Sequence, residues 1–202
     1  MKILSELKKP LLVTLVLMVL CGLVYPLLLT GISQVVFPHQ ANGSLIELGG
    51  KPVGSALVGQ DFTDSRFLQG RPSAVNNNTF TDAGAFGGVS SGSQNYSPSN
   101  PALTERVQRD MDAFLAAHPD LTVTDIPADL VTASGSGLDP DISPASAAIQ
   151  IPQLAKNTGL SEETLSQFVA ENTTGKFLGI FGEARVNVLG VNLAIAEALN
   201  LA

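Results

Sequence analysis

The most apolar stretch of the chain lies near its N-terminus. Leu11 to Val36 is almost entirely apolar, and no charged side chain occurs between Pro10 and Pro38. A helix of about 20 residues crosses the hydrocarbon core of a bilayer, where a helix satisfies its own backbone hydrogen bonds. The pattern therefore predicts a transmembrane helix over residues 11–36, with Pro26 as a candidate kink.

A cleaved signal peptide is the alternative for this segment. Its apolar region usually spans about 7–15 residues and ends at a small-residue cleavage site. The run in this chain is longer, and no convincing A-x-A site precedes Ala41. We therefore expect the segment to be retained as an anchor.

Basic residues at the two ends of the span predict its orientation. Lys2, Lys8 and Lys9 precede it, whereas the next basic residue is Lys51. Since short basic flanks remain in the cytoplasm, we expect residues 1–10 in the cytoplasm and residues 37–202 outside it.

Strand-like runs follow the anchor. Ser44–Leu48 and Val53–Val58 flank a Gly- and Pro-containing turn and predict a hairpin. Leu121–Ile126 and Leu130–Ala133 have the pattern of extended segments, and Arg185–Val188 that of a strand. Two to four strands are therefore expected.

Helical patterns alternate with these runs. Asn100 followed by Pro101 is a typical helix start, and Ser161 followed by two glutamates is another. Pro144–Lys156 and Leu189–Leu199 also look helical. The sequence thus predicts an α+β fold: one N-terminal transmembrane helix followed by a single mixed α/β extracytoplasmic domain.

A polar segment interrupts this domain. Residues 70–99 are crowded with Gly, Ser, Asn and Pro and contain few apolar residues. We expect a long loop there, of the kind that is usually functional or disordered.

Charge argues against one class of function, and cysteine content shows how the outer domain is not stabilised. Three of the eleven basic residues precede the span and eight follow it, whereas seventeen of the eighteen acidic residues follow it. This acidic balance argues against nucleic-acid binding. The single cysteine, Cys21, lies inside the span, so the outer domain must be held together by its core.

Motifs for catalysis fail on their spacing. Gly175-Lys176 lacks the upstream glycine and the following Ser or Thr of a P-loop, and no D-K-T-G phosphorylation sequence is present. Ser134 and Ser136 lack the glycines of a nucleophile elbow. Both histidines, His39 and His118, are expected at the surface.

Asp139 and Asp141 flank Pro140 and leave two interpretations open. The carboxylates could contribute to a hard cation site. More often, an Asp-Pro-Asp sequence builds a turn and caps the following helix.

Four blocks of sequence resemble one known family. They are VTASGSGLDPDISPASAAIQ at 131–150, GQDFTDSRFLQGRPSA at 59–74, SPSNPALTERV at 97–107 and FGEARVNVLGVNLAIAEAL at 181–199. In order and spacing they resemble the C subunit of the Kdp-type potassium-transporting P-type ATPase, a bacterial and archaeal family. The single N-terminal span agrees with this resemblance.

The resemblance implies a single-pass membrane protein that is a non-catalytic accessory subunit of a high-affinity, ATP-driven potassium uptake complex. The implied partners are a channel-like potassium-binding subunit, an ATP-hydrolysing P-type subunit and a small membrane peptide. It implies no cofactor for this chain. A stand-alone anchored binding or enzymatic domain is the alternative.

ATP is the point on which resemblance and topology diverge. The family is proposed to raise the ATP affinity of the hydrolysing subunit, with the glutamine that matches Gln150 contacting the nucleotide. An extracytoplasmic domain, however, is separated from cytosolic ATP by about 30 Å of hydrocarbon. Both expectations remain open at this stage.

Other residues of these blocks are candidates for either partner contact or structural support. Gly135 and Gly137 would allow close approach of another backbone. Arg185 and Asn187 are polar residues in an apolar stretch, and Arg71 could pair with a carboxylate inside or outside the domain. The remaining candidates are Ser73, Asn100, Ser134, Asp139, Ser143 and Asn192.

Overall fold

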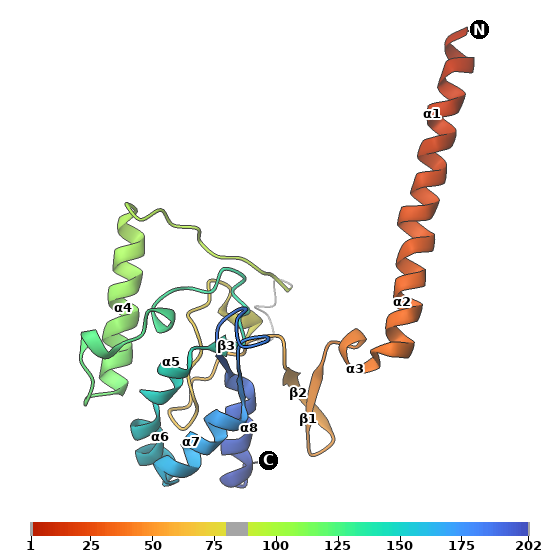
Figure 1. The fold of residues 1–202 in the computed structure, drawn as a ribbon. Helices are drawn as coiled ribbons and strands as arrows, with labels where there is room; N and C mark the ends of the chain where they lie inside the picture. Colours follow the sequence, from red (N-terminus) through yellow and green to blue (C-terminus); the bar gives the residue numbers. More distant parts are fainter. Residues whose placement is uncertain (1, 80–88, 202) are drawn as a thin grey trace. The chain divides into compact units, whose positions relative to one another are not determined.

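A computed structural model describes residues 2–79 and 89–201 of the chain (Figure 1). The chain divides into two compact units, residues 1–45 and residues 46–202. The mixture of helices and strands confirms the predicted fold class.

The first unit is almost entirely helical. Among the described residues, one helix, Glu6–Val36, is long and apolar enough to cross a membrane. It consists of α1 (Lys2–Val19), a π-helical turn η1 (Leu20–Val24) and α2 (Tyr25–Val36), and a short α3 (Pro38–Ala41) follows.

The π-helical turn lies where the sequence placed a kink. Pro26 has no N–H to donate, and in an α-helix its ring meets the carbonyl of the residue four positions earlier, which is Gly22. Gly22 lies inside η1. A wider turn accommodates this conflict without ending the helix.

The second unit contains five strands and several helices among its described residues. In chain order these are β1 (Leu45–Leu48, whose first residue belongs to the first unit), β2 (Lys51–Ser55), η2 (Asn76–Asn78), α4 (Pro101–Ala117), η3 (Val123–Asp125), η4 (Ala128–Leu130), β3 (Asp141–Ile142), α5 (Pro144–Ala148), α6 (Ile151–Thr158), α7 (Glu162–Glu171), β4 (Thr173–Thr174), β5 (Arg185–Asn187) and α8 (Val188–Ala198). β1 and β2 pair with each other, and this confirms the predicted hairpin.

A small antiparallel sheet forms the centre of this unit. Its strand order is β3-β5-β4, so the predicted strand near residue 185 is its middle strand. Val186 pairs with Ile142 on one side and with Thr173 on the other, and it is completely buried. The sheet therefore joins β3 to the β4–β5 pair, which lies about 30 residues or more further along the chain.

Helices complete the core. Their buried apolar side chains pack into one cluster with Val186, and the cluster includes Leu165 of α7 and Val191 and Ile195 of α8. The predicted helix starts are confirmed: Asn100 caps α4 by accepting the N–H of Ala102 (3.0 Å), and Ser161 caps α7.

Two of the predicted extended segments are wrong. Leu121–Ile126 contains the 3₁₀ turn η3, because Thr122 and Asp125 form a reciprocal capping box. Leu130–Ala133 begins at the end of η4. At Leu121–Ile126 the bonds between polar side chains and the backbone compete with strand formation, despite the alternating sequence. At Leu130 and Val131 the backbone N–H groups instead close the turn by donating to the carbonyl oxygens of Pro127 and Ala128.

The predicted helix at Pro144–Lys156 is two helices. α5 ends at Ala148, and α6 starts at Ile151 with Gln150 in its N-cap position. Pro152 lies in the first turn of α6, where its missing N–H breaks no helical bond.

The predicted polar loop is irregular where it is described. Residues 70–79 and 89–99 contain one short 3₁₀ helix, η2, and otherwise isolated turns and irregular backbone, and residues 80–88 lie outside the described residues. Asn76, Asn77 and Asn78 all have left-handed backbone angles, with φ near +50°. Asparagine tolerates this region better than most residues.

Candidate functional site

Two buried side-chain amides hold one short piece of backbone from two sides. Asn192 of α8 accepts the N–H of Leu68 (2.7 Å) and donates to its carbonyl oxygen (2.9 Å). Gln150 accepts the N–H of Gln69 (2.9 Å) and donates to the carbonyl oxygen of Gln69 (3.2 Å) and to that of Ser146 (3.0 Å). We call this arrangement the amide clamp, formed by Gln150 and Asn192 around Leu68 and Gln69.

The two side-chain amides pair with the N–H and carbonyl groups of residues 68–69, as the backbone of a neighbouring strand would in a sheet. Gln150 is 1% exposed, Asn192 2% and Leu68 0%. Burying peptide groups without partners is costly, so the two amides allow residues 68–69 to pass through the core without a paired strand.

This geometry bears on the nucleotide contact that resemblance implies for Gln150. Both ends of its amide already bond to the backbone inside the core. A nucleotide contact with the amide of Gln150 would therefore compete with these backbone bonds.

A second group of contacts joins the segment after Gly70 to the Ser134–Leu138 turn. Ser73 Oγ donates to the carbonyl oxygen of Gly137 (2.7 Å). Ser134 is buried, and its Oγ accepts the N–H of Gly137 (3.0 Å). The two serines thus fix the turn from both sides.

The two glycines of this turn differ. Gly137 has φ +69°, and a Cβ atom there would lie 2.7 Å from the carbonyl oxygen of Gly92. The predicted close approach of a backbone is therefore intramolecular at this position. A Cβ atom on Gly135 would meet nothing within 4 Å among the described residues, so its surface is open to a partner.

Arg71 pairs with a carboxylate inside the domain. Its guanidinium lies 2.8 Å from Asp139 and donates to the carbonyl oxygen of Thr132 (3.3 Å). Its buried Nε has no hydrogen-bond partner among the described residues. The other Asp139 oxygen accepts the N–H of Asp141 (3.1 Å), a side-chain-to-backbone bond of the Asx-turn kind, and Asp141 then begins β3.

Ser143, not Asp141, caps the next helix. Its Oγ accepts the N–H of Ser146 (3.1 Å), and both its own N–H (2.7 Å) and its hydroxyl (3.1 Å) donate to Asp129. Burial alone would raise the pKa of Asp129, but hydrogen bonds from Ser146 and Ser143 outweigh it and lower the pKa. The carboxylate therefore holds the start of α5.

The polar pair of β5 has one structural and one exposed member. Asn187 caps α8 by accepting the N–H of Gly190 (2.9 Å) and donates to the carbonyl oxygen of Ala56 (3.0 Å). Arg185 pairs with Asp141 (2.8 Å), yet its side chain is 57% exposed. Burial raises the pKa of Asp141, against the opposing effect of Arg185.

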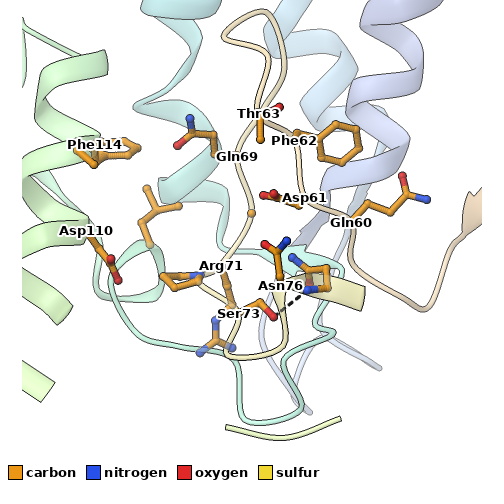
Figure 2. Close-up of a pocket in the computed structure, with 15 residues that line it drawn as sticks. Gln60, Asp61, Phe62, Thr63, Gln69, Arg71, Ser73, Asn76, Asp110 and Phe114 are labelled. Atoms are coloured by element: carbon orange, nitrogen blue, oxygen red, sulfur yellow. Dashed lines mark hydrogen bonds between the residues drawn. The ribbon is translucent and has the colours of Figure 1, made fainter. Parts of the chain in front are cut away.

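A polar pocket of about 420 Å³ lies beside the clamped segment. Gln60, Gln69 and Arg71 line it together with Asp110 and Phe114 of α4, and Figure 2 shows these side chains around the opening. Asp110 is paired with Arg106 (2.7 Å). The described part of the chain holds no group of three His, Cys, Asp or Glu side chains arranged for a metal ion.

The sequence analysis missed two residues that hold the start of α5, and it wrongly expected one histidine at the surface. Asp129 was not singled out, although an acidic residue near a Ser-x-x-Ser helix start is a usable indication. Ser146 likewise escaped notice. His118 is buried and not at the surface: its ring stacks on Phe114 with centroids 4.1 Å apart, and its Nδ1 lies 2.9 Å from the Phe114 carbonyl oxygen.

Comparison with known proteins decides the family. Residues 7–197 match the family described as "KdpC: K+-transporting ATPase, c chain". The chain belongs to this family. This confirms the resemblance drawn from the four sequence blocks.

Individual relatives agree over nearly their full length. The chain is 63% identical to a potassium-transporting ATPase KdpC subunit of Clostridium kluyveri, over 96% of this chain and 94% of the relative. It is 55% identical to one of Clostridioides difficile (98% and 99%) and 49% identical to one of Caldanaerobacter subterraneus (96% of each). The family role is that of an accessory subunit in potassium transport.

Proposed function

We propose that this chain is a non-catalytic accessory subunit of an ATP-driven potassium uptake complex in a bacterial or archaeal cell membrane. The observation that carries the proposal is the family match over residues 7–197. The partners would be the channel-like potassium-binding subunit, the ATP-hydrolysing P-type subunit and the small membrane peptide.

The contacts of the site residues support a structural role. Ser73, Ser134 and Asn192 all bond to backbone within the second unit. His118, the sole histidine of that unit, lies against its own helix. These side chains fix the shape of a domain, and such a shape can present loops to a partner.

Orientation is part of the proposal. Lys8 and Lys9 lie at the N-terminal end of the candidate span Glu6–Val36, before its uncharged stretch, and basic flanks favour a cytoplasmic N-terminus. The second unit would then lie outside the cytoplasm, away from cytosolic ATP. The buried, fully bonded Gln150 agrees with a role in which ATP binds to the complex and not to this side chain.

Co-purification tests the proposal. An affinity tag is added after Ala202, membranes are dissolved in mild detergent, and the captured proteins are identified by mass spectrometry. Larger polytopic subunits of a potassium-transporting ATPase should accompany the chain. Recovery of the chain alone, under conditions in which those subunits are present in the membrane, would favour the stand-alone anchored domain.

A reporter that is active only in the cytoplasm tests the orientation. Fused after Ala202, it should be silent, and fused before Met1 it should be active. The reverse pattern would place the second unit beside cytosolic ATP and make a nucleotide contact sterically accessible to the domain.

A further inference from the structure

The loop between β4 and β5 exposes a cluster of large apolar side chains. Phe177, Leu178, Ile180 and Phe181 are 72%, 73%, 75% and 62% exposed. Elsewhere in the described part of the second unit, large apolar residues are exposed singly or as the pair Leu57 and Val58, which is ordinary for a protein surface. A contiguous cluster instead marks contact with another molecule or with a membrane.

This apolar tip, residues 177–181, is a tight turn whose two ends pair with each other. The N–H of Phe177 donates to the carbonyl oxygen of Phe181 (2.8 Å), and the N–H of Phe181 donates to that of Phe177 (3.0 Å). Gly179 and Ile180 donate to carbonyl oxygens of Lys176 and Phe177 at 3.1 and 3.2 Å. These four bonds reduce the number of backbone N–H groups that would lose water when the side chains of the tip enter hydrocarbon.

The chemistry of the tip favours lipid over a protein partner. From Phe177 to Gly182 no side chain can donate or accept a hydrogen bond, whereas a typical protein interface forms about one hydrogen bond per 100–200 Å². Lys176 and Glu183 flank the tip with opposite charges. Attraction to anionic lipid is therefore not needed, and apolar burial is the driving force.

The candidate span brings a membrane within reach of the apolar tip. The second unit begins at Ile46, ten residues after the end of the candidate span at Val36. Ten residues reach about 35 Å when fully extended. Once the span is inserted, the second unit therefore remains close to the bilayer surface, where its apolar tip can meet lipid.

We propose that the apolar tip inserts its side chains into the lipid bilayer as a membrane contact additional to the span. The inserted tip holds the domain against the membrane surface. This inference rests on the proposed membrane anchoring and is independent of the ATPase partners.

Fluorescence quenching tests it in the full chain. The protein contains no tryptophan, so Phe177→Trp and Phe181→Trp each introduce a single probe at the tip. Each variant is reconstituted in phosphatidylcholine vesicles with and without bromine on the acyl chains. Both probes should emit at shorter wavelength than tryptophan in water and lose most of their emission in the brominated vesicles.

Val123→Trp is the matched control. Val123 is also an exposed apolar residue, in η3, and a probe there should keep its emission in brominated vesicles. Tip probes that keep their emission would overturn the inference, and so would equal quenching of the control. A shift to shorter wavelength that needs the larger ATPase subunits, without quenching, would assign the tip to a protein partner and contradict lipid insertion.

Carbonate extraction of the same vesicles distinguishes a failure of tip insertion from a failure of membrane anchoring by the span. Retention of the chain with unquenched tip probes would refute tip insertion alone. Release of the chain by carbonate would refute the anchoring on which the inference depends.

Discussion

Asn192→Ala removes one half of the amide clamp and should destabilise the second unit severely. The substitution leaves the N–H and the carbonyl oxygen of Leu68 without their partners at a position that is 0% exposed. Each buried polar group without a partner costs about 1–3 kcal/mol. The free energy of unfolding should therefore fall by about 2–6 kcal/mol, a large part of the stability of a typical domain.

Pulse proteolysis in urea measures the loss of stability on the full chain in detergent. A short protease pulse digests only unfolded molecules, so the surviving fraction gives the urea midpoint. At a slope of about 2 kcal/mol per molar urea, typical of a small domain, the midpoint should fall by about 1–3 M. Asn157→Ala is the control: Asn157 contacts the carbonyl oxygen of Ser65 (2.6 Å) at the surface, and its loss should cost less than about 1 kcal/mol. Equal midpoints for the two variants would refute the clamp as a source of stability.

The remaining predictions use the same urea midpoint or the captured complex. Gly137→Ala should lower stability by about 1–3 kcal/mol, because φ is +69° and a Cβ atom would contact Gly92, whereas Gly135→Ala should be nearly neutral. The lowered pKa of Asp129 contributes stability above the ordinary carboxyl pKa of about 4, and this is lost as the pH falls through the folded-state pKa. The midpoints of Asp129→Asn and the natural chain should therefore differ at pH 7 and converge in acid; a constant difference would contradict this. Arg185→Ala should reduce capture of the ATPase subunits while leaving the midpoint nearly unchanged, and Asn187→Ala should lower the midpoint; the opposite pattern would reverse the roles assigned to β5.

Local features of the fold could be predicted from the sequence because short-range chemistry determines them. The span depends on one continuous apolar run, and the Asn100-Pro101 helix start and the Ser161 cap depend on residues within a few positions. The same reasoning failed at Leu121–Ile126, since alternation favoured a strand while the bond between Thr122 and Asp125 favoured a turn.

The site was less predictable because its contacts are long-range. Asn192 and Leu68 are 124 residues apart, and Gln150 and Gln69 are 81. One sequence offers no indication of such pairs, so Gln150 could be marked as important without its role being recognised. Hydrophobicity likewise gives no indication that Phe177–Phe181 is exposed, since the same residues would fit a core.

Potassium-stimulated ATP hydrolysis tests the central proposal most directly. The ATPase complex is purified from cells that contain this chain and from cells that lack it, and hydrolysis is measured with and without potassium. Removal of the chain should abolish or sharply weaken the potassium-stimulated part of the hydrolysis, and the purified chain alone should hydrolyse no ATP. Full stimulation of a complex that lacks the chain would contradict its role as an accessory subunit.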